Sequence, residues 1–115
     1  NELRKALFAA KIISYSQGFL MMRKASTEFN WHLNAGSIAA MWRGGCIIRS
    51  VFLDDIQRAF ARKADLESLL FDPFFSSALS DCQAGWRSTI ALAVQSGIPV
   101  PTLSSAIAFY DGYRT

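Results

Sequence analysis

A chain of 115 residues is long enough for one hydrophobic core and too short for several domains. Half of its residues are hydrophobic and nine are phenylalanine, which excludes an intrinsically disordered chain. The net charge of +3 comes from scattered basic residues, so the composition favours a solvated surface over the basic stripe of a nucleic-acid-binding protein.

The cysteines and the single histidine are too few and too far apart for a metal site. Cys46 and Cys82 belong to no Cys-x-x-Cys pair, and His32 is the only histidine. Two lone thiols in apolar surroundings indicate free cysteines in a reducing compartment, and we therefore expect a cytoplasmic protein. The start of the chain does not look like a signal peptide.

Residues 2–25 predict one long helix that is apolar on nearly all sides, with Leu7 on one face and Phe8 and Phe19 on others. A domain of this size cannot surround such a helix completely, so we expect part of it to face other protein. Gly18 lies inside the helix, where glycine costs about 1 kcal/mol relative to alanine, and indicates close approach of a neighbouring helix.

Two shorter helices are predicted next. Asn34 is a good N-cap for a helix over 35–43, which the pair Gly44-Gly45 ends. The following helix, over 46–62, has apolar residues at three- and four-residue spacing, with Asp54 and Arg58 as a supporting i,i+4 ion pair.

The last part of the chain predicts a capped turn and two more helices. Asp65 is expected to cap a turn over 66–70. Asp72-Pro73 is a strong helix start, and the apolar seam that follows predicts a long helix over 73–96. Gly97 is the expected C-cap, and Pro101 begins a final helix that ends near residue 112.

The predicted fold class is therefore all-α, with about five to six helices, two of them long. No segment alternates with period two, and no turn joins two apolar runs as a hairpin. The uncharged runs 12–22 and 88–110 are no convincing membrane spans, because the first is too short and glycine and proline break the second. We expect the helices at 2–25 and 73–96 to leave a large apolar surface uncovered.

The stretch from Met41 to Ser50 is the most unusual part of the sequence. It holds Trp42, Arg43, Gly44, Gly45 and Arg49 between apolar segments. The glycine pair follows a helix and matches no nucleotide-binding motif, so a helix end is the better interpretation. The two arginines could grip a phosphate or carboxylate, or they could satisfy helix-end carbonyls and acids at a corner. Residue types favour the structural role.

The other candidates for chemistry are weak. His32 has no carboxylate in a recognisable pattern and reads as a loop histidine. The adjacent acids Asp54 and Asp55 point about 100° apart on a helix and do not converge on a cation. Cys46 and Cys82 are better read as small hydrophobic residues than as nucleophiles. Taken alone, the residues indicate an all-α domain with no visible catalytic constellation.

The sequence closely resembles the C-terminal helical domain of 6-phosphogluconate dehydrogenase, the decarboxylating, NADP-dependent enzyme of the pentose phosphate pathway. The likeness covers nearly the whole chain, and its blocks follow in the same order. Four blocks carry the likeness: Lys11 to Phe19, Met41 to Leu53, Gly97-Ile98-Pro99 and Phe109 to Arg114.

The resemblance implies a larger enzyme. Its members have an N-terminal Rossmann domain that binds NADP, form homodimers through the helical domain, and place a C-terminal tail in the partner subunit. They convert 6-phosphogluconate to ribulose 5-phosphate and carbon dioxide without a metal, using a lysine as base and a glutamate as acid. These properties are expectations for the whole enzyme.

The family's functional residues find no match in this chain. The catalytic stretch has a lysine, a His-Asn pair and a Glu-Tyr pair, whereas here His32 precedes Leu33 and Glu28 precedes Phe29. Residues 1–115 therefore read as one helical segment, without the Rossmann domain or the tail, and no catalytic, cofactor-binding, substrate-binding or metal-binding residue is assigned. Gly18, Trp42, Arg43, Gly44, Gly45 and Arg49 are expected to be structural. A stand-alone helical interaction module is the alternative, and neither nucleic acid nor a membrane is an expected partner.

Overall fold

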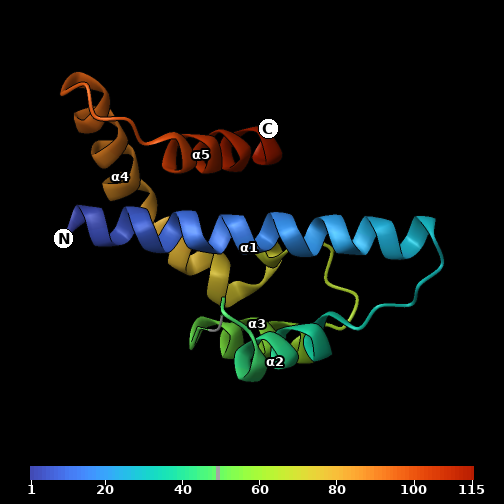
Figure 1. Cartoon of the computed structure of the whole chain (residues 1–115). Helices are drawn as coiled ribbons and strands as arrows, with labels where there is room; N and C mark the ends of the chain where they lie inside the picture. The colour runs from blue at the N-terminus through green and yellow to red at the C-terminus, as the bar shows by residue number, and fades with distance from the viewer. Residues whose placement is uncertain (49) are drawn as a thin grey trace.

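The computed structural model describes every residue of the chain except residue 49, and the described residues contain helices and no strand. Figure 1 shows one long helix, α1, with the other elements on two sides of it. The elements are α1 (Glu2–Glu28), α2 (Ala35–Gly45), α3 (Phe52–Arg62), the 3-10 turn η1 (Leu69–Phe71), α4 (Pro73–Gln95) and α5 (Pro101–Arg114). The all-α prediction is confirmed.

Helix α1 is the spine of the fold, and α4 packs closely against its N-terminal half. Asn1 caps the helix by accepting a hydrogen bond from the backbone N–H of Arg4 at 3.2 Å. Small buried residues such as Ala6 and Ala9 let the two helices approach. Gly85 of α4 marks the crossing, because a Cβ there would lie 3.3 Å from the Cα of Glu2.

Helix α4 begins and ends where the sequence indicates. The Asp72 carboxylate accepts hydrogen bonds from the backbone N–H groups of Phe74 and Phe75, and Pro73 is the first helical residue. The chain leaves the helix through Gly97, whose φ of +70° is a left-handed conformation that glycine adopts without strain. Helix α5 then returns beside α1, and Tyr110 packs on the buried ring of Trp86 at 5.9 Å.

Helices α2 and α3 form a hairpin on the other side of α1 (Figure 1). Aromatic contacts join this hairpin to the spine. The ring of Phe19 on α1 lies 5.3 Å from Trp42 on α2 and 5.5 Å from Phe60 on α3, measured between centroids. Phe52 at the start of α3 meets Phe75 of α4 at 5.5 Å, so the hairpin contacts both long helices.

Three local predictions are wrong. The helix predicted over 46–62 begins only at Phe52, because Ser50 stops the chain in a turn whose carbonyl accepts from Leu53 N–H. Asp65 caps nothing, and the 3-10 turn begins later, after Ser68, whose hydroxyl accepts from Leu70 N–H. Arg58 pairs with Asp55 three residues before it, instead of Asp54 four before.

Large apolar side chains are exposed on both long helices, as predicted. On α1, Leu3 and Leu7 are 61% and 66% exposed, and on α4, Leu92 and Val94 are 65% and 67% exposed. Patches of this kind mark protein contacts when they are contiguous. Among the described residues, no helix is both long and apolar enough to cross a membrane.

Candidate functional site

Trp42 and Arg43 connect α2 to its neighbours. Trp42 lies on the ring of Phe19, and the guanidinium Nε of Arg43 donates to the Asp54 carboxylate of α3 at 3.2 Å. Both members of this ion pair are about a third or more exposed, so solvent screens it and its contribution to stability is small. Arg43 therefore ties α2 to α3, while Arg49 lies outside the described residues.

The glycines singled out by the sequence do not make close contacts within the chain. Gly44 and Gly45 are the last residues of α2, and a Cβ at either would meet no atom within 4 Å. The same is true of Gly18 in α1. The sequence analysis read Gly44-Gly45 as the end of a helix, and α2 does end at Gly45. The glycine at a tight crossing is Gly85, which the sequence analysis did not single out.

The segment between α2 and α3 is anchored to α1 by two polar contacts. Lys11 Nζ donates to Ser50 Oγ at 2.8 Å, and the Tyr15 hydroxyl donates to the carbonyl of Ile48 at 2.9 Å. Burial raises the pKa of Tyr15, with a smaller contribution from Cys46, so the phenol stays protonated as a donor. Lys11 also lies 5.6 Å from the centroid of Phe52. Sequence spacing gave no signal for these contacts, which join residues more than 30 positions apart.

A second anchor joins the end of α3 to the start of α4. Arg62 donates three hydrogen bonds of 2.8–3.0 Å to the Asp72 carboxylate, in a bidentate arrangement. Asp72 is 2% exposed, whereas the Arg62 side chain is 47% exposed. One carboxylate therefore both caps α4 and receives the arginine of the preceding helix.

The exposed C-terminal end of α5 carries a cluster of ion pairs. Arg87 of α4 donates to Asp111 at 2.9 Å, and Arg114 donates to the same carboxylate at 3.1 Å. The hydrogen bond from Arg87 is the main reason that the pKa of Asp111 falls from 3.8 to about 2. The same bond raises the pKa of Arg87, so this pair stays charged at ordinary pH. It links the middle of α4 to the C-terminal end of α5.

The titratable residues that the structure describes do not converge on one site. His32 is exposed in the loop before α2, as predicted. Cys82 is buried and burial raises the pKa of its thiol, while Cys46 is only half-buried. Asp54 and Asp55 each pair with a different arginine and share no cation position. No group of three metal-ligating side chains occurs in the part of the chain that the structure describes.

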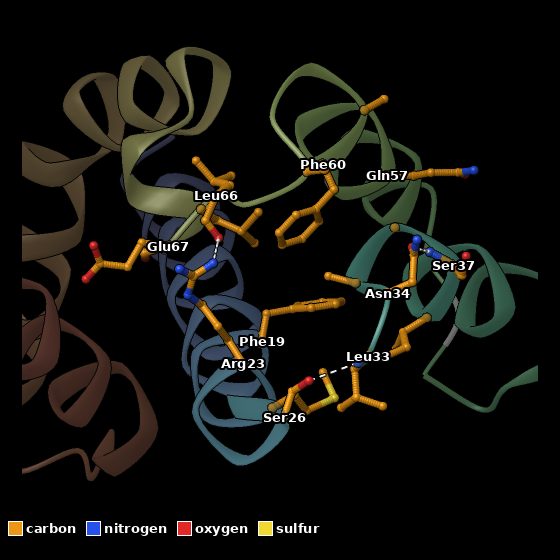
Figure 2. Close-up of a pocket in the computed structure, with 18 of the residues that line it drawn as sticks. Phe19, Arg23, Ser26, Leu33, Asn34, Ser37, Gln57, Phe60, Leu66 and Glu67 are labelled. Atoms are coloured by element: carbon orange, nitrogen blue, oxygen red, sulfur yellow. Dashed lines mark hydrogen bonds between the residues drawn. The ribbon is translucent and has the colours of Figure 1, made fainter. Parts of the chain in front are cut away.

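A cavity of about 710 Å³ separates the C-terminal half of α1 from the α2–α3 hairpin. Figure 2 shows Phe19 and Phe60 next to each other in its lining, with ring centroids 5.5 Å apart, and Arg23 and Asn34 on opposite sides of them. Nothing in the spacing of these residues along the sequence indicates a cavity.

The family model for the C-terminal domain of 6-phosphogluconate dehydrogenase matches residues 1–115. Proteins named 6-phosphogluconate dehydrogenase, decarboxylating, from Rattus norvegicus and Homo sapiens are 60% and 58% identical over 114 residues, 99% of this chain and 24% of theirs. The second such protein of Saccharomyces cerevisiae is 58% identical, with 99% of this chain and 23% of its own length covered.

A solved structure agrees with these relatives. The Plasmodium falciparum 6-phosphogluconate dehydrogenase, studied in its apo form and with NADP+ or 6-phosphogluconate, superposes with a TM-score of 0.98 at 41% identity. The match covers all of this chain and 25% of that one. The chain thus spans about a quarter of the length of the relatives that it matches.

Proposed function

Because the chain belongs to the family of the 6-phosphogluconate dehydrogenase C-terminal domain, we propose that it is the helical segment of an NADP-dependent enzyme. This enzyme oxidises and decarboxylates 6-phosphogluconate to ribulose 5-phosphate and carbon dioxide. The observation that carries the proposal is the match of all 115 residues to that family, at 60% identity to a relative named for this reaction.

The segment itself supplies structure and leaves the chemistry to the rest of the enzyme. Some of its polar side chains hold separate segments of the fold together, as those of Arg62 and Lys11 do, and its one histidine is exposed on a loop. No described pair of side chains forms the nucleophile and base of a catalytic site. The chain therefore acts as the scaffold on which the remaining three quarters of the enzyme are built.

The described residues do not fit the binding of NADP. A dinucleotide needs glycines that let the backbone approach its phosphates, in a turn between a strand and a helix. Gly44 and Gly45 are the last two residues of α2 and border open space. We assign NADP to a domain outside this segment and derive no step of the reaction through these residues.

The segment also belongs to the interface of a homodimer. The apolar side chains exposed on α1 and α4, including Leu7 and Leu92, support this assignment because isolated domains seldom leave so many large apolar groups in water. The two free cysteines are consistent with a cytoplasmic enzyme, because thiols stay reduced in that compartment.

The test is a spectrophotometric assay of the protein at the length that its gene encodes. We expect NADPH to accumulate when NADP and 6-phosphogluconate are both present, with release of carbon dioxide, and no turnover by residues 1–115 alone. Failure of the full-length protein to reduce NADP would refute the proposed activity. Turnover by the 115-residue chain would refute the assignment of the chemistry to other parts.

The alternative, a stand-alone interaction module, makes a different prediction for the gene. A Gly-x-Gly-x-x-Gly unit between a strand and a helix, encoded upstream in the same reading frame, would exclude the module. A reading frame that covers only these residues would favour it.

A further inference from the structure

The α2–α3 hairpin is tied to the rest of the chain from one side. Its two connections, residues 29–34 and 63–68, both run beside the C-terminal half of α1 (Figure 1). Arg23, in that half of α1, donates to a backbone carbonyl of the second connection at 2.8 Å. The first connection is exposed throughout, and Asn30 and His32 in it have left-handed φ angles of 57° and 54°. The covalent links of the hairpin are therefore placed as the hinge of a flap would be.

The hairpin packs mainly on itself. The backbones of α2 and α3 approach each other closely, whereas they approach the backbone of α1 at few points. Within the hairpin, Arg43 of α2 also donates to the Asp54 carboxylate of α3 at 3.2 Å. Between the hairpin and the C-terminal half of α1 lies the cavity of about 710 Å³. A unit with close internal packing and few outside contacts can separate from a protein while the rest stays folded.

Aromatic side chains bridge the boundary between the hairpin and the long helices. Phe19 of α1 contacts Trp42 and Phe60, and the ring of Phe52 lies 5.5 Å from that of Phe75 on α4. Phe19 and Phe60 are 5% and 9% exposed, so the closed position is the stable one. Helices α2 and α3 have 11 residues each, and helices of this length are marginal in water without packing. A hairpin that separates from α1 therefore also loses helical hydrogen bonds.

Two polar contacts hold the other end of the hairpin, where the chain turns from α2 to α3. Lys11 Nζ donates to Ser50 Oγ at 2.8 Å, and the Tyr15 hydroxyl donates to the carbonyl of Ile48 at 2.9 Å. Both donors precede Phe19, the first residue of α1 that lines the cavity. Neither donor side chain is fully buried, so water can replace either bond, and each bond adds only a modest stabilisation. These bonds are placed as the latch of a flap would be.

We propose that the α2–α3 hairpin is a flap that opens from α1 as one unit while α1, α4 and α5 stay folded. Residues 29–34 and 63–68 form its hinge, and the bonds from Lys11 and Tyr15 form its latch. Opening exposes the apolar face of α3 and gives solvent full access to the cavity. This motion belongs to the segment itself and does not depend on the proposed dehydrogenase activity.

Native-state hydrogen exchange, read by mass spectrometry of peptides, tests this motion because it detects openings that occur over minutes to hours. The protein is used at the length that its gene encodes, without denaturant. Only amides beyond the first turn of each helix are compared, because these form helical hydrogen bonds. We expect protection factors in α2 and α3 to be at least about tenfold lower than those in the middle of α4.

Variants identify the latch. Tyr15→Phe keeps the ring, whose centroid lies 5.2 Å from that of Phe52, and removes the hydroxyl bond. We expect it to lower protection in α2 and α3 by a further factor of about 2 to 10, the usual effect of one hydrogen bond, and to leave the middle of α4 unchanged. Tyr110→Phe is the matched control, because Tyr110 lies on α5 and packs on Trp86, away from the hairpin.

A second pair of variants makes the test independent of Tyr15. Lys11→Met keeps an unbranched apolar stem near the Phe52 ring and removes the bond to Ser50, so it should lower protection in the hairpin within the same range. Lys24→Met changes an exposed lysine of the same helix and should leave protection unchanged. The proposal is overturned if α2, α3 and α4 are equally protected, if the latch variants lower protection in all helices alike, or if either control lowers protection in the hairpin as much as its matched variant.

Discussion

The buried carboxylate of Asp72 offers the sharpest test of how the helices are held together. It caps α4 through two backbone N–H groups and accepts three hydrogen bonds from Arg62. Losing an N-cap costs about 0.5–2 kcal/mol. A buried pair costs about 3–5 kcal/mol to break and an exposed pair less than about 1 kcal/mol. With Arg62 half-exposed, about 1–2 kcal/mol is a reasonable value for this pair.

Two substitutions separate these effects. We expect Asp72→Ala to lower the free energy of unfolding by about 2–3 kcal/mol, because it removes the cap and the ion pair. Asp72→Asn keeps a good cap and loses the charge, so about 1–2 kcal/mol is expected. Urea unfolding followed by far-ultraviolet circular dichroism measures both. Asp81→Ala is the control, since Asp81 is exposed on the same helix.

Two results would show that Asp72 does not stabilise the fold in this way. If Asp72→Ala costs less than about 1 kcal/mol, neither the cap nor the pair has the strength assigned to it. If Arg62→Met destabilises the native protein and the Asp72→Asn variant equally, the two side chains are not coupled.

Three further predictions concern charge, packing and reactivity. Because the pKa of Asp111 in the folded protein lies below its ordinary value, the stability that this residue adds is present above pH 3.8 and is lost as the pH falls toward 2. Asp111→Asn should therefore flatten the plot of unfolding free energy against pH in this range, and an unchanged plot would contradict the prediction. Gly18→Ala should stabilise the chain by up to about 1 kcal/mol, because alanine favours a helix and nothing lies near its Cβ. Gly85→Ala should lose this gain because its Cβ would press against α1, and equal denaturation midpoints for the two variants would refute a tight crossing at Gly85. A thiol reagent followed by mass spectrometry should modify half-buried Cys46 before buried Cys82, and the reverse order would be inconsistent with the fold.

The positions of the helices could be predicted from the sequence because their signals are local. Asp72-Pro73 and Gly97 fixed both ends of α4, and Asn34 marked the start of α2. The start of α3 was missed because the apolar spacing runs on through residues 46–51, where Ser50 turns the backbone before Phe52. Periodicity alone does not reveal such a turn.

The contacts between helices could not be predicted, because they depend on how distant segments meet. The sequence pointed to Gly18 as a site of close approach between helices, and the tight crossing is at Gly85 instead. Nothing in the spacing of Arg23, Phe19 and Phe60 indicates a shared cavity, which arises only when the hairpin docks beside α1. The family was predictable from the blocks of sequence, and the comparisons confirm it.

The central claim is that this segment supplies scaffold and not chemistry, and one measurement tests it most directly. His32→Asn and Cys46→Ser, combined in the full-length protein, remove the exposed histidine and the accessible thiol of the described chain. Asparagine tolerates the positive φ of 54° at residue 32. We predict a kcat/KM for 6-phosphogluconate within about twofold of the native value, since losing a general acid or base would cost about 10²- to 10⁴-fold. A loss of that size in a variant with native stability would contradict the account.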